Sequence, residues 1–316
     1  MNDTAIASAV MMLRPAHFGA NAQTAVSNRF QRQQLEGLDI EAAARAEFDK
    51  AVGMLERAGI TIEVIEDTSE PSKPDAVFPN NWISFHPDGT VCLYPMEAVN
   101  RRIERRPDIP EILAQERGYR VSHIEDWSGT EQEARYLEGT GSLVLDHATH
   151  TAYACCSSRT DPGLVHAWCE RFGYRPVLFH ALDEAGTAIY HTNVMMCLGD
   201  GFAVICLDSI RDRSERDGIE ARIKTSGRQI VSISMAQMAQ FAGNMLMLQA
   251  RGGTKLLVMS RRAEQSLTEA QRALLEQHAR LVSIPINVIE DCGGGGIRCM
   301  MAEIFLPRIS GGAADG

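Results

Sequence analysis

The sequence predicts an α/β fold made of five similar units, each with a hairpin of two strands, a helix and a final strand. One observation is that the glycines that follow predicted helices recur at nearly equal intervals, at Gly59, Gly118, Gly173 and Gly227. Another is that turn signals such as Pro87-Asp88-Gly89 separate apolar runs, where proline fixes φ and glycine accepts positive φ. Repetition of one supersecondary unit indicates a ring or a linear array. A two-layer α/β sandwich fits the same pattern, so both architectures stay open at this level.

The first two units follow this plan with one gap. In the first unit, a strand over residues 10–13 precedes a helix that Asp39 caps, and a strand over 60–65 ends the unit. The second unit has strands over 76–85 and 91–94, a helix after Asp108 and a strand over 119–124. The first unit lacks the opening strand of its hairpin.

The remaining three units are more complete. The third has a hairpin over 143–155, a helix with Pro162 at its favoured first position, and a strand over 175–179. The fourth has a hairpin over 192–207, a polar helix and a strand over 229–233. The fifth has strands over 244–249 and 255–259, a helix from the capping box of Thr268 and Gln271, and a strand over 281–289. The tail over 300–306 could supply the missing first strand and close a ring.

Composition narrows the class of protein. The 316 residues are 45% hydrophobic, with a net charge of −10 and a pI of about 5.4, so we expect one domain over residues 1–316 and no nucleic-acid partner. No apolar run approaches the roughly 18–20 residues that span a bilayer, and the first residues do not resemble a signal peptide. The eight cysteines lack zinc-site spacing. We therefore expect a cytoplasmic protein that does not bind a membrane, with most cysteines buried.

One loop near the end of the chain suggests chemistry. Four consecutive glycines, residues 293–296, precede Cys299, and glycine is costly to order unless a ligand or another backbone comes close. A cysteine beside such a loop is a candidate nucleophile, and Cys292 is a rival in the same stretch. His191 and Glu138 stand near the start of hairpins in other units, where a ring would bring them to the same cavity. A plain flexible loop with a structural cysteine is the alternative.

The order of short motifs resembles the guanidine-modifying superfamily, which includes arginine deiminases, dimethylarginine dimethylaminohydrolases and amidinotransferases. The resemblance extends from Arg14-Pro15-Ala16 to Phe305-Leu306-Pro307 and is closest to the citrulline utilisation hydrolases. It implies a five-bladed ββαβ propeller (pentein) with pseudo-fivefold symmetry, closed by the C-terminal strand, and an active site on the axis.

The resemblance also implies roles for individual residues. The glycine-rich Arg-Cys-Met motif makes Cys299 the nucleophile, a family histidine at a strand start matches His191, and the Glu-Gly motif that supports the histidine matches Glu138. The Ser-x-Arg-Thr motif makes Arg159 the residue that holds a substrate carboxylate. The Phe-x-x-Asp motif matches Phe78 to Asn81 and makes these two residues substrate-binding, together with Asn193.

Two departures from the family pattern bear on the substrate. Asn81 and Asn193 stand where deiminases have aspartates that bind a cationic guanidinium. An asparagine side chain offers a donor and an acceptor without charge, which suits the neutral ureido group of citrulline. Binding a guanidinium without a counter-charge would cost several kcal/mol. The alternative is that the asparagines are turn residues and another carboxylate, such as Asp75, binds a guanidinium.

The predicted reaction is hydrolysis of citrulline through an S-carbamoyl intermediate on Cys299, with His191 moving protons and Glu138 orienting it. We expect a small-molecule amino-acid substrate and no metal or organic cofactor. A deiminase or dimethylaminohydrolase, an amidinotransferase, and a non-catalytic binding protein on the same fold are the competing functions. A homodimer is compatible with the sequence. Asn21, Asn28 and Asn244 are candidates for binding the substrate amino group, and residues 208–216 are a candidate lid.

Overall fold

The computed structural model describes residues 6–25, 28, 30–31 and 38–309. Its strands fall into five sheets of three strands each. The strands are β1 (Ala9–Arg14), β2 (Thr61–Glu66), β3 (Ile83–Phe85), β4 (Thr90–Leu93), β5 (His123–Asp126), β6 (Leu143–Asp146), β7 (Thr151–Cys155), β8 (Arg175–Phe179), β9 (Met196–Leu198), β10 (Phe202–Ile205), β11 (Gln229–Ser232), β12 (Leu246–Gln249), β13 (Lys255–Ser260), β14 (Arg280–Ile284) and β15 (Ala302–Glu303).

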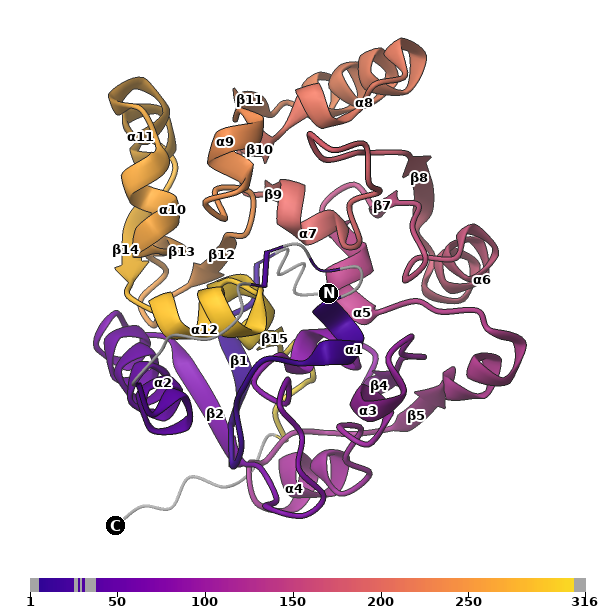
Figure 1. The fold of residues 1–316 in the computed structure, drawn as a ribbon, viewed down its shortest axis with the longest axis vertical. Helices are drawn as coiled ribbons and strands as arrows, with labels where there is room; N and C mark the ends of the chain where they lie inside the picture. The colour runs from indigo at the N-terminus through magenta and orange to yellow at the C-terminus, as the bar shows by residue number, and fades with distance from the viewer. Residues whose placement is uncertain (1–5, 26–27, 29, 32–37, 310–316) are drawn as a thin grey trace.

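Every sheet has the same pairing. A central strand pairs antiparallel with one neighbour and parallel with the other, as β4 does with β3 and β5. The sheet orders are β15-β1-β2, β3-β4-β5, β6-β7-β8, β11-β10-β9 and β12-β13-β14. Figure 1 shows the five sheets in a propeller-like arrangement around the centre of the molecule. The repeat predicted from the glycine spacing is therefore present as repeated sheet topology, and a two-layer sandwich is wrong.

The first sheet contains the strand that the sequence left missing. β15 pairs antiparallel with β1, with Val10 opposite Glu303. The C-terminal tail therefore completes the first sheet. This confirms the prediction that residues 300–306 supply its missing strand.

One helix from each repeat lies outside the sheets (Figure 1). They are α2 (Ile40–Arg57), α4 (Ile109–Gln115), α6 (Pro162–Phe172), α8 (Arg213–Thr225) and α11 (Glu269–Glu276). Each packs an apolar stripe on its own sheet: α2 buries Phe48 and Leu55 with Val10 and Met12 of β1 in one cluster. Fully burying side chains of this size contributes about 1.5–3 kcal/mol each. The predicted cap at Asp39 is confirmed, because its carboxylate accepts from the amide of Ala42 at 3.0 Å.

Short helices occupy the connections, and several replace expected strands. They are α1 (Ala22–Ala25), α3 (Val99–Arg102), α5 (Gly139–Ser142), α7 (Thr192–Met195), α9 (Met235–Met238), α10 (Arg261–Ser266) and α12 (Asn287–Gly293), with 3₁₀ helices η1 (Pro79–Asn81), η2 (Ser128–Glu133), η3 (Leu207–Ser209) and η4 (Ile297–Met300). The predicted strand over 281–289 is wrong beyond Ile284, since α12 follows. The strands predicted to start at residues 76 and 192 instead begin with helical turns, and the one over 119–124 is displaced to β5.

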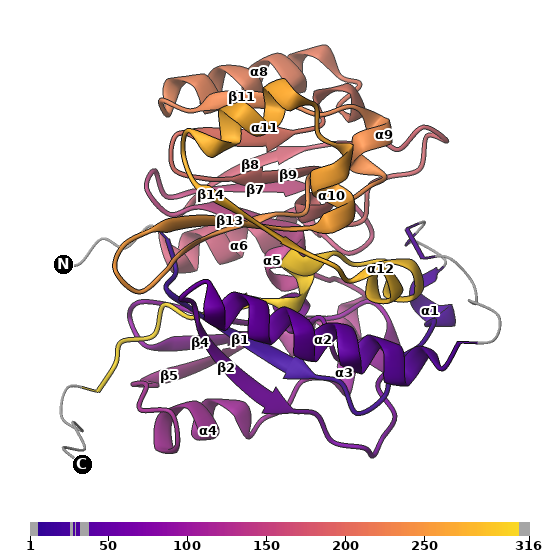
Figure 2. The same cartoon turned by 90° about the vertical axis from the view of Figure 1, so that its left-hand side faces the viewer.

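The molecule has two distinct faces, seen from the side in Figure 2. The helices α1 and α12 lie at one face, whereas the turn between β12 and β13 lies at the opposite face. In the described ranges, which omit residues 1–5, 26–27, 29, 32–37 and 310–316, no helix has the length and apolar character needed to cross a membrane.

Candidate active site

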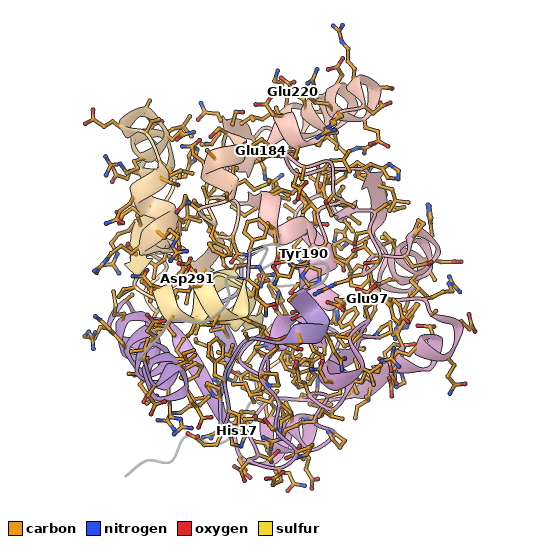
Figure 3. The ribbon with its side chains drawn as sticks, in the orientation of Figure 1. His17, Glu97, Glu184, Tyr190, Glu220 and Asp291 are labelled. Carbon is orange, nitrogen blue, oxygen red and sulfur yellow. The ribbon has the colours of Figure 1, made fainter. Side chains whose placement is uncertain are left out.

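The predicted site residues come together from helical turns that precede inner strands. Asn81 ends η1, Glu138 caps α5, His191 caps α7, and Cys299 lies in η4. All four side chains are almost completely buried. Figure 3 shows Tyr190, the neighbour of His191, near the centre of the molecule, while Glu220 and His17 lie toward the periphery. The arrangement therefore builds one central cavity from residues that are far apart in sequence.

The thiol of Cys299 is held by two amides. Asn244 donates to Sγ from Nδ2 at 3.3 Å, and Asn193 donates from Nδ2 at 3.5 Å. The side chain of Asn244 is itself fixed, because its Oδ1 accepts from the amide of Arg298 and its Nδ2 also donates to the carbonyl of Asn193. Two neutral donors on one sulfur favour the thiolate once it forms.

His191 is oriented by a buried carboxylate. Its Nε2 lies 2.8 Å from Oε2 of Glu138, whose other oxygen accepts from the amide of Glu97 at 3.0 Å. Arg159 lies 3.5 Å from Glu138 and 3.3 Å from Glu97. The carboxylate therefore fixes the imidazole ring, while Arg159 offsets its negative charge.

The charges in the empty site are set by burial and by these partners. Burial lowers the pKa of His191 to about 4, although the carboxylate of Glu138 opposes this change. Burial would raise the pKa of Glu138, but Arg159 and His191 reverse it and lower this pKa to about 2. Burial raises the pKa of the Cys299 thiol, against the amide of Asn244 and the charge of Arg298. At neutral pH the resting site therefore has a neutral thiol, a neutral imidazole and an ionised Glu138.

The low pKa of His191 predicts a pH effect on stability. The unfolded chain binds a proton at this residue below about pH 6.5, whereas the folded protein does not until about pH 4. This residue therefore contributes fully to stability above pH 6.5, and the contribution falls by about 3 kcal/mol as the pH drops to 4. Urea unfolding at pH 7, 6, 5 and 4 should show a smaller loss in His191→Gln than in the unmodified protein. Equal losses in both would contradict the assignment.

Asn81 and Asp75 form the opposite wall of the cavity. Oδ1 of Asn81 accepts from Arg101 at 2.9 Å, so its Nδ2 is free to donate, and Nδ2 has no hydrogen-bond partner among the described residues. Oδ2 of Asp75 accepts from Asn21 at 2.7 Å, while its Oδ1 has no such partner in the described chain. Both residues line the cavity that Cys299 and His191 also line. The wall thus offers one donor and one carboxylate oxygen.

The glycine loop fits closely around this cavity. A Cβ at Gly293 or Gly295 would lie 2.8 Å from the ring of Phe78, and one at Gly296 would lie 2.5 Å from Oδ1 of Asn244. Phe78 lines the cavity as predicted, but it also supports the loop that leads to the thiol. The glycines are therefore required by close packing, and the flexible-loop alternative is wrong.

Residues near the N-terminus cover the cavity. Asn28 donates to the carbonyls of Gly293 and Gly294, and the carbonyl of Thr24 accepts from Arg159 at 3.2 Å. The space that remains is about 20 Å³, which is room for roughly one water molecule. Little free space therefore remains beside Cys299 on this face, and residues 208–216, the expected lid, do not line the cavity.

Several residues near the site differ from the expectation. Asn21 and Asn28 lie at the cover, and Asn244 binds the thiol, where we expected a residue for the substrate amino group. The sequence carries no signal for Arg101, because the residues around it resemble those of a surface helix. In the structure Arg101 is buried and holds the side chain of Asn81. Cys292, the rival nucleophile, is buried in α12 and does not line the cavity.

Gly141 provides a test of the geometry. A Cβ at this position would lie 2.5 Å from Nδ2 of Asn81 and 2.9 Å from the ring of His191. Gly141→Ala should therefore displace both groups. A displacement of about 1 Å in a reacting group lowers the rate by about 100-fold. The matched control is Gly129→Ala, since nothing lies within 4 Å of the place that its Cβ would take. Steady-state kinetics on both variants, with unfolding midpoints, checks this, and normal activity in Gly141→Ala would refute it.

Comparison with known proteins agrees with this fold and site. The apo structure of ArgZ, an arginine dihydrolase from the ornithine-ammonia cycle in cyanobacteria, has a TM-score of 0.71 and 18% identity, covering 96% of this chain and 41% of ArgZ. This chain therefore spans less than half of full-length ArgZ. A variant of the N-terminal domain of ArgZ, covalently bound to a reaction intermediate, has a TM-score of 0.71 and 17% identity, with 95% and 99% of the two chains covered.

A third solved structure is a mutant of DDAH from Pseudomonas aeruginosa complexed with citrulline. Its TM-score is 0.64 with 13% identity, and the match covers 95% of this chain and 100% of that chain. Identities this low show the fold alone. Among curated protein sequences, none matches this chain.

The fold and the arrangement of the motifs define a member of the guanidine-modifying superfamily. The family model for the eukaryotic N,N-dimethylarginine dimethylhydrolases matches residues 14–306, and the chain belongs to that family.

Proposed function

We propose that the protein hydrolyses the ureido group of citrulline to ornithine, carbon dioxide and ammonia, as in the citrulline utilisation hydrolases. The observation that carries this proposal is the orientation of Asn81. Arg101 can only donate, so it holds Oδ1 of Asn81 and leaves Nδ2 as a donor beside His191. A donor at this position suits the ureido oxygen and opposes a guanidinium, which has only N–H donors.

The proposed reaction depends on Cys299, His191 and Glu138. His191 takes the thiol proton, Sγ attacks the ureido carbon, and Nδ2 of Asn81 stabilises the negative charge that forms on the oxygen. The C–N bond to ornithine breaks as His191 returns the proton to the leaving nitrogen. Glu138 keeps the ring oriented and stabilises the imidazolium, which is why its ionised form matters.

The remaining polar groups would bind the amino-acid end of the substrate. Arg159 would pair with the α-carboxylate, as the Ser-x-Arg-Thr resemblance implies. Oδ1 of Asp75 faces the same cavity without a hydrogen-bond partner in the described residues, so it suits the α-ammonium group. We also infer that the five sheets form one closed propeller domain, since β15 joins the end of the chain to β1.

A second candidate is hydrolysis of a guanidino compound, and two observations favour it. Asp75 supplies a buried carboxylate that could meet a guanidinium, and a cation beside Cys299 would lower the thiol pKa. ArgZ, whose domain has the same fold, is an arginine dihydrolase. The citrulline complex of the Pseudomonas aeruginosa DDAH mutant supports the ureido proposal equally.

Separate assays with citrulline, arginine and dimethylarginine distinguish the two candidates. Ornithine from citrulline alone supports the ureido proposal. Ornithine from arginine as well as citrulline would instead support hydrolysis of both groups. Citrulline that accumulates from arginine or dimethylarginine would overturn the ureido proposal in favour of a deiminase or dimethylaminohydrolase.

Asn81→Asp tests the role of the donor directly. The change replaces Nδ2 by a carboxylate oxygen, so loss of one stabilising donor should lower citrulline turnover by about 100-fold or more. The matched variant Asn81→Leu removes the donor without adding a charge. We expect both to lose citrulline turnover, and only Asn81→Asp to gain turnover of a guanidino substrate. Citrulline turnover that persists in both variants would show that Asn81 does not contact the ureido oxygen.

A further inference from the structure

A second cavity approaches the thiol from the opposite face of the molecule. It has a volume of about 310 Å³ and lies where four of the sheets converge, lined by residues of β6, β9, β12 and β15. The exposed residues Ala148 and Asp200 line it, so it reaches the surface near the hairpin turns. We call this space the turn-side cavity. Its volume is much larger than that of the narrow space around Cys299 on the other face.

The inner end of the turn-side cavity is next to the nucleophile. Asn193 and Arg298 line it, and Asn193 donates to Sγ of Cys299 from Nδ2 while Arg298 is the residue before Cys299. Oδ1 of Asn193 is buried and has no hydrogen-bond partner among the residues described. The side chain of Asn193 thus contacts the sulfur and also lines the cavity, and its Oδ1 can accept a hydrogen bond from a water molecule.

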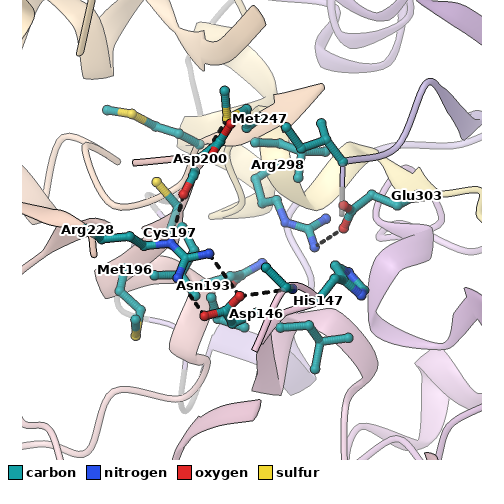
Figure 4. Close-up of a pocket in the computed structure, with 18 of the residues that line it drawn as sticks. Asp146, His147, Asn193, Met196, Cys197, Asp200, Arg228, Met247, Arg298 and Glu303 are labelled. Atoms are coloured by element: carbon teal, nitrogen blue, oxygen red, sulfur yellow. Dashed lines mark hydrogen bonds and ion pairs between the residues drawn. The ribbon is translucent and has the colours of Figure 1, made fainter. Parts of the chain in front are cut away.

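The walls of the turn-side cavity are charged but balanced. Arg228 forms two hydrogen bonds to Asp146, at 2.6 and 2.8 Å, and Arg298 forms one to Glu303 at 2.9 Å (Figure 4). Each of these two arginines therefore already has a carboxylate, so neither is a spare cation for an anionic ligand. The rest of the lining is largely apolar, but these charged groups give water molecules several hydrogen-bond partners within the cavity.

We propose that the turn-side cavity delivers the hydrolytic water to the enzyme intermediate, an inference that rests on the proposed function. The space toward Thr24 and Asn28 is about 20 Å³ even without substrate. Bound substrate therefore leaves little room for a water molecule on that side. Water arriving past Asn193 reaches the carbonyl carbon of the S-carbamoyl group from the other face. The water oxygen bonds to that carbon while His191 takes one water proton, the C–S bond breaks, His191 returns the proton to the sulfur, and carbamic acid leaves and decays to carbon dioxide and ammonia.

The test is to obstruct the mouth of the turn-side cavity and to measure the hydrolysis of the covalent intermediate. Ala148→Trp combined with Gln249→Trp places bulk on two different elements of the lining, and Leu198→Trp does so separately. The matched control is Ala221→Trp, an exposed alanine that lines a different surface cavity. None of these four residues lines the narrow space around Cys299.

The readout is the decay of the covalent intermediate, followed by rapid quenching and intact-protein mass spectrometry after mixing with citrulline. We expect decay to slow by about tenfold in the obstructed variants and not in the control, with kcat and KM falling together and kcat/KM unchanged. Decay at the normal rate in both obstructed proteins would overturn the proposal, as would a fall in kcat/KM without a longer-lived intermediate. If the unmodified protein formed no intermediate from citrulline, the proposed function would fail first, so the two failures are distinct.

Discussion

Cys299→Ala is expected to lose at least about 10⁴-fold of the hydrolytic activity while the protein stays folded. The thiol is the nucleophile of the proposed reaction, and it occupies the point where Asn193, Asn244 and the glycine loop meet. Because alanine removes only the sulfur, the packing of η4 should persist and the unfolding midpoint should change little. Ornithine and ammonia release, measured with the thermal unfolding curve, checks both halves of this expectation.

Cys292→Ala is the matched control for that experiment. Cys292 is equally buried and lies seven positions earlier in the chain, but it is part of α12 and outside the cavity, and burial raises its pKa. Its replacement should leave kcat within about twofold. If Cys292→Ala were inactive and Cys299→Ala active, the assignment of the nucleophile would be reversed.

Glu138→Gln is expected to lower kcat by about 10³-fold to 10⁴-fold, with KM changed less. The carboxylate holds Nε2 of His191 at 2.8 Å and keeps its pKa from falling further. Glutamine is nearly isosteric, but its amide can present a donor to Nε2, and it cannot stabilise the imidazolium by charge. The kinetic constants and the pH dependence of kcat measure both effects.

Glu97→Gln is the control for the loss of negative charge. Glu97 also pairs with Arg159, at 3.3 Å, but it does not contact His191. We expect it to alter KM through Arg159 and to leave the pH dependence of kcat unchanged. An equal loss of kcat in both variants would mean that the charge of Arg159, and not the orientation of His191, governs the reaction.

The elements that the sequence predicted well are those with a local cause. β8 has the expected bounds of 175–179, and α6 begins at Pro162 behind the cap of Asp161. Proline, capping side chains and alternating apolar residues act within a few positions, so one chain is enough to reveal them. Even β15 could be inferred, because the repeat left one strand unfilled.

The missed elements are short helical turns, and the candidate site residues lie in these turns or cap them. η1, α5, α7 and η4 have three or four residues each, too few to show a helical period. They form because the chain must turn into the centre before each inner strand, which is a tertiary cause. The motifs therefore located Cys299, His191 and Glu138, but not the angle at which each side chain enters the cavity.

The contacts across the cavity were beyond sequence reasoning for a related reason. Arg101 meets Asn81 and Asn244 meets Cys299 across separations of 20 and 55 residues. A residue pattern gives the face of an element but not the partner that a distant segment presents. The sequence therefore indicated Asn244 without its contact to Cys299, and gave no signal for Arg101.

The pairing of β15 with β1 also determines when the candidate site is completed during synthesis. A ribosome makes the segment with His191 and Glu138 long before it makes Cys299, and the sheet that anchors η4 needs strands from both ends of the described chain. Contacts between such distant segments form slowly, because a long loop must close first. In the proposed reaction, the nascent protein would therefore have its proton carrier but no positioned nucleophile until its last sheet assembles. Recovery of hydrolysis after dilution from denaturant would time that final event, independently of the recovery of helix content.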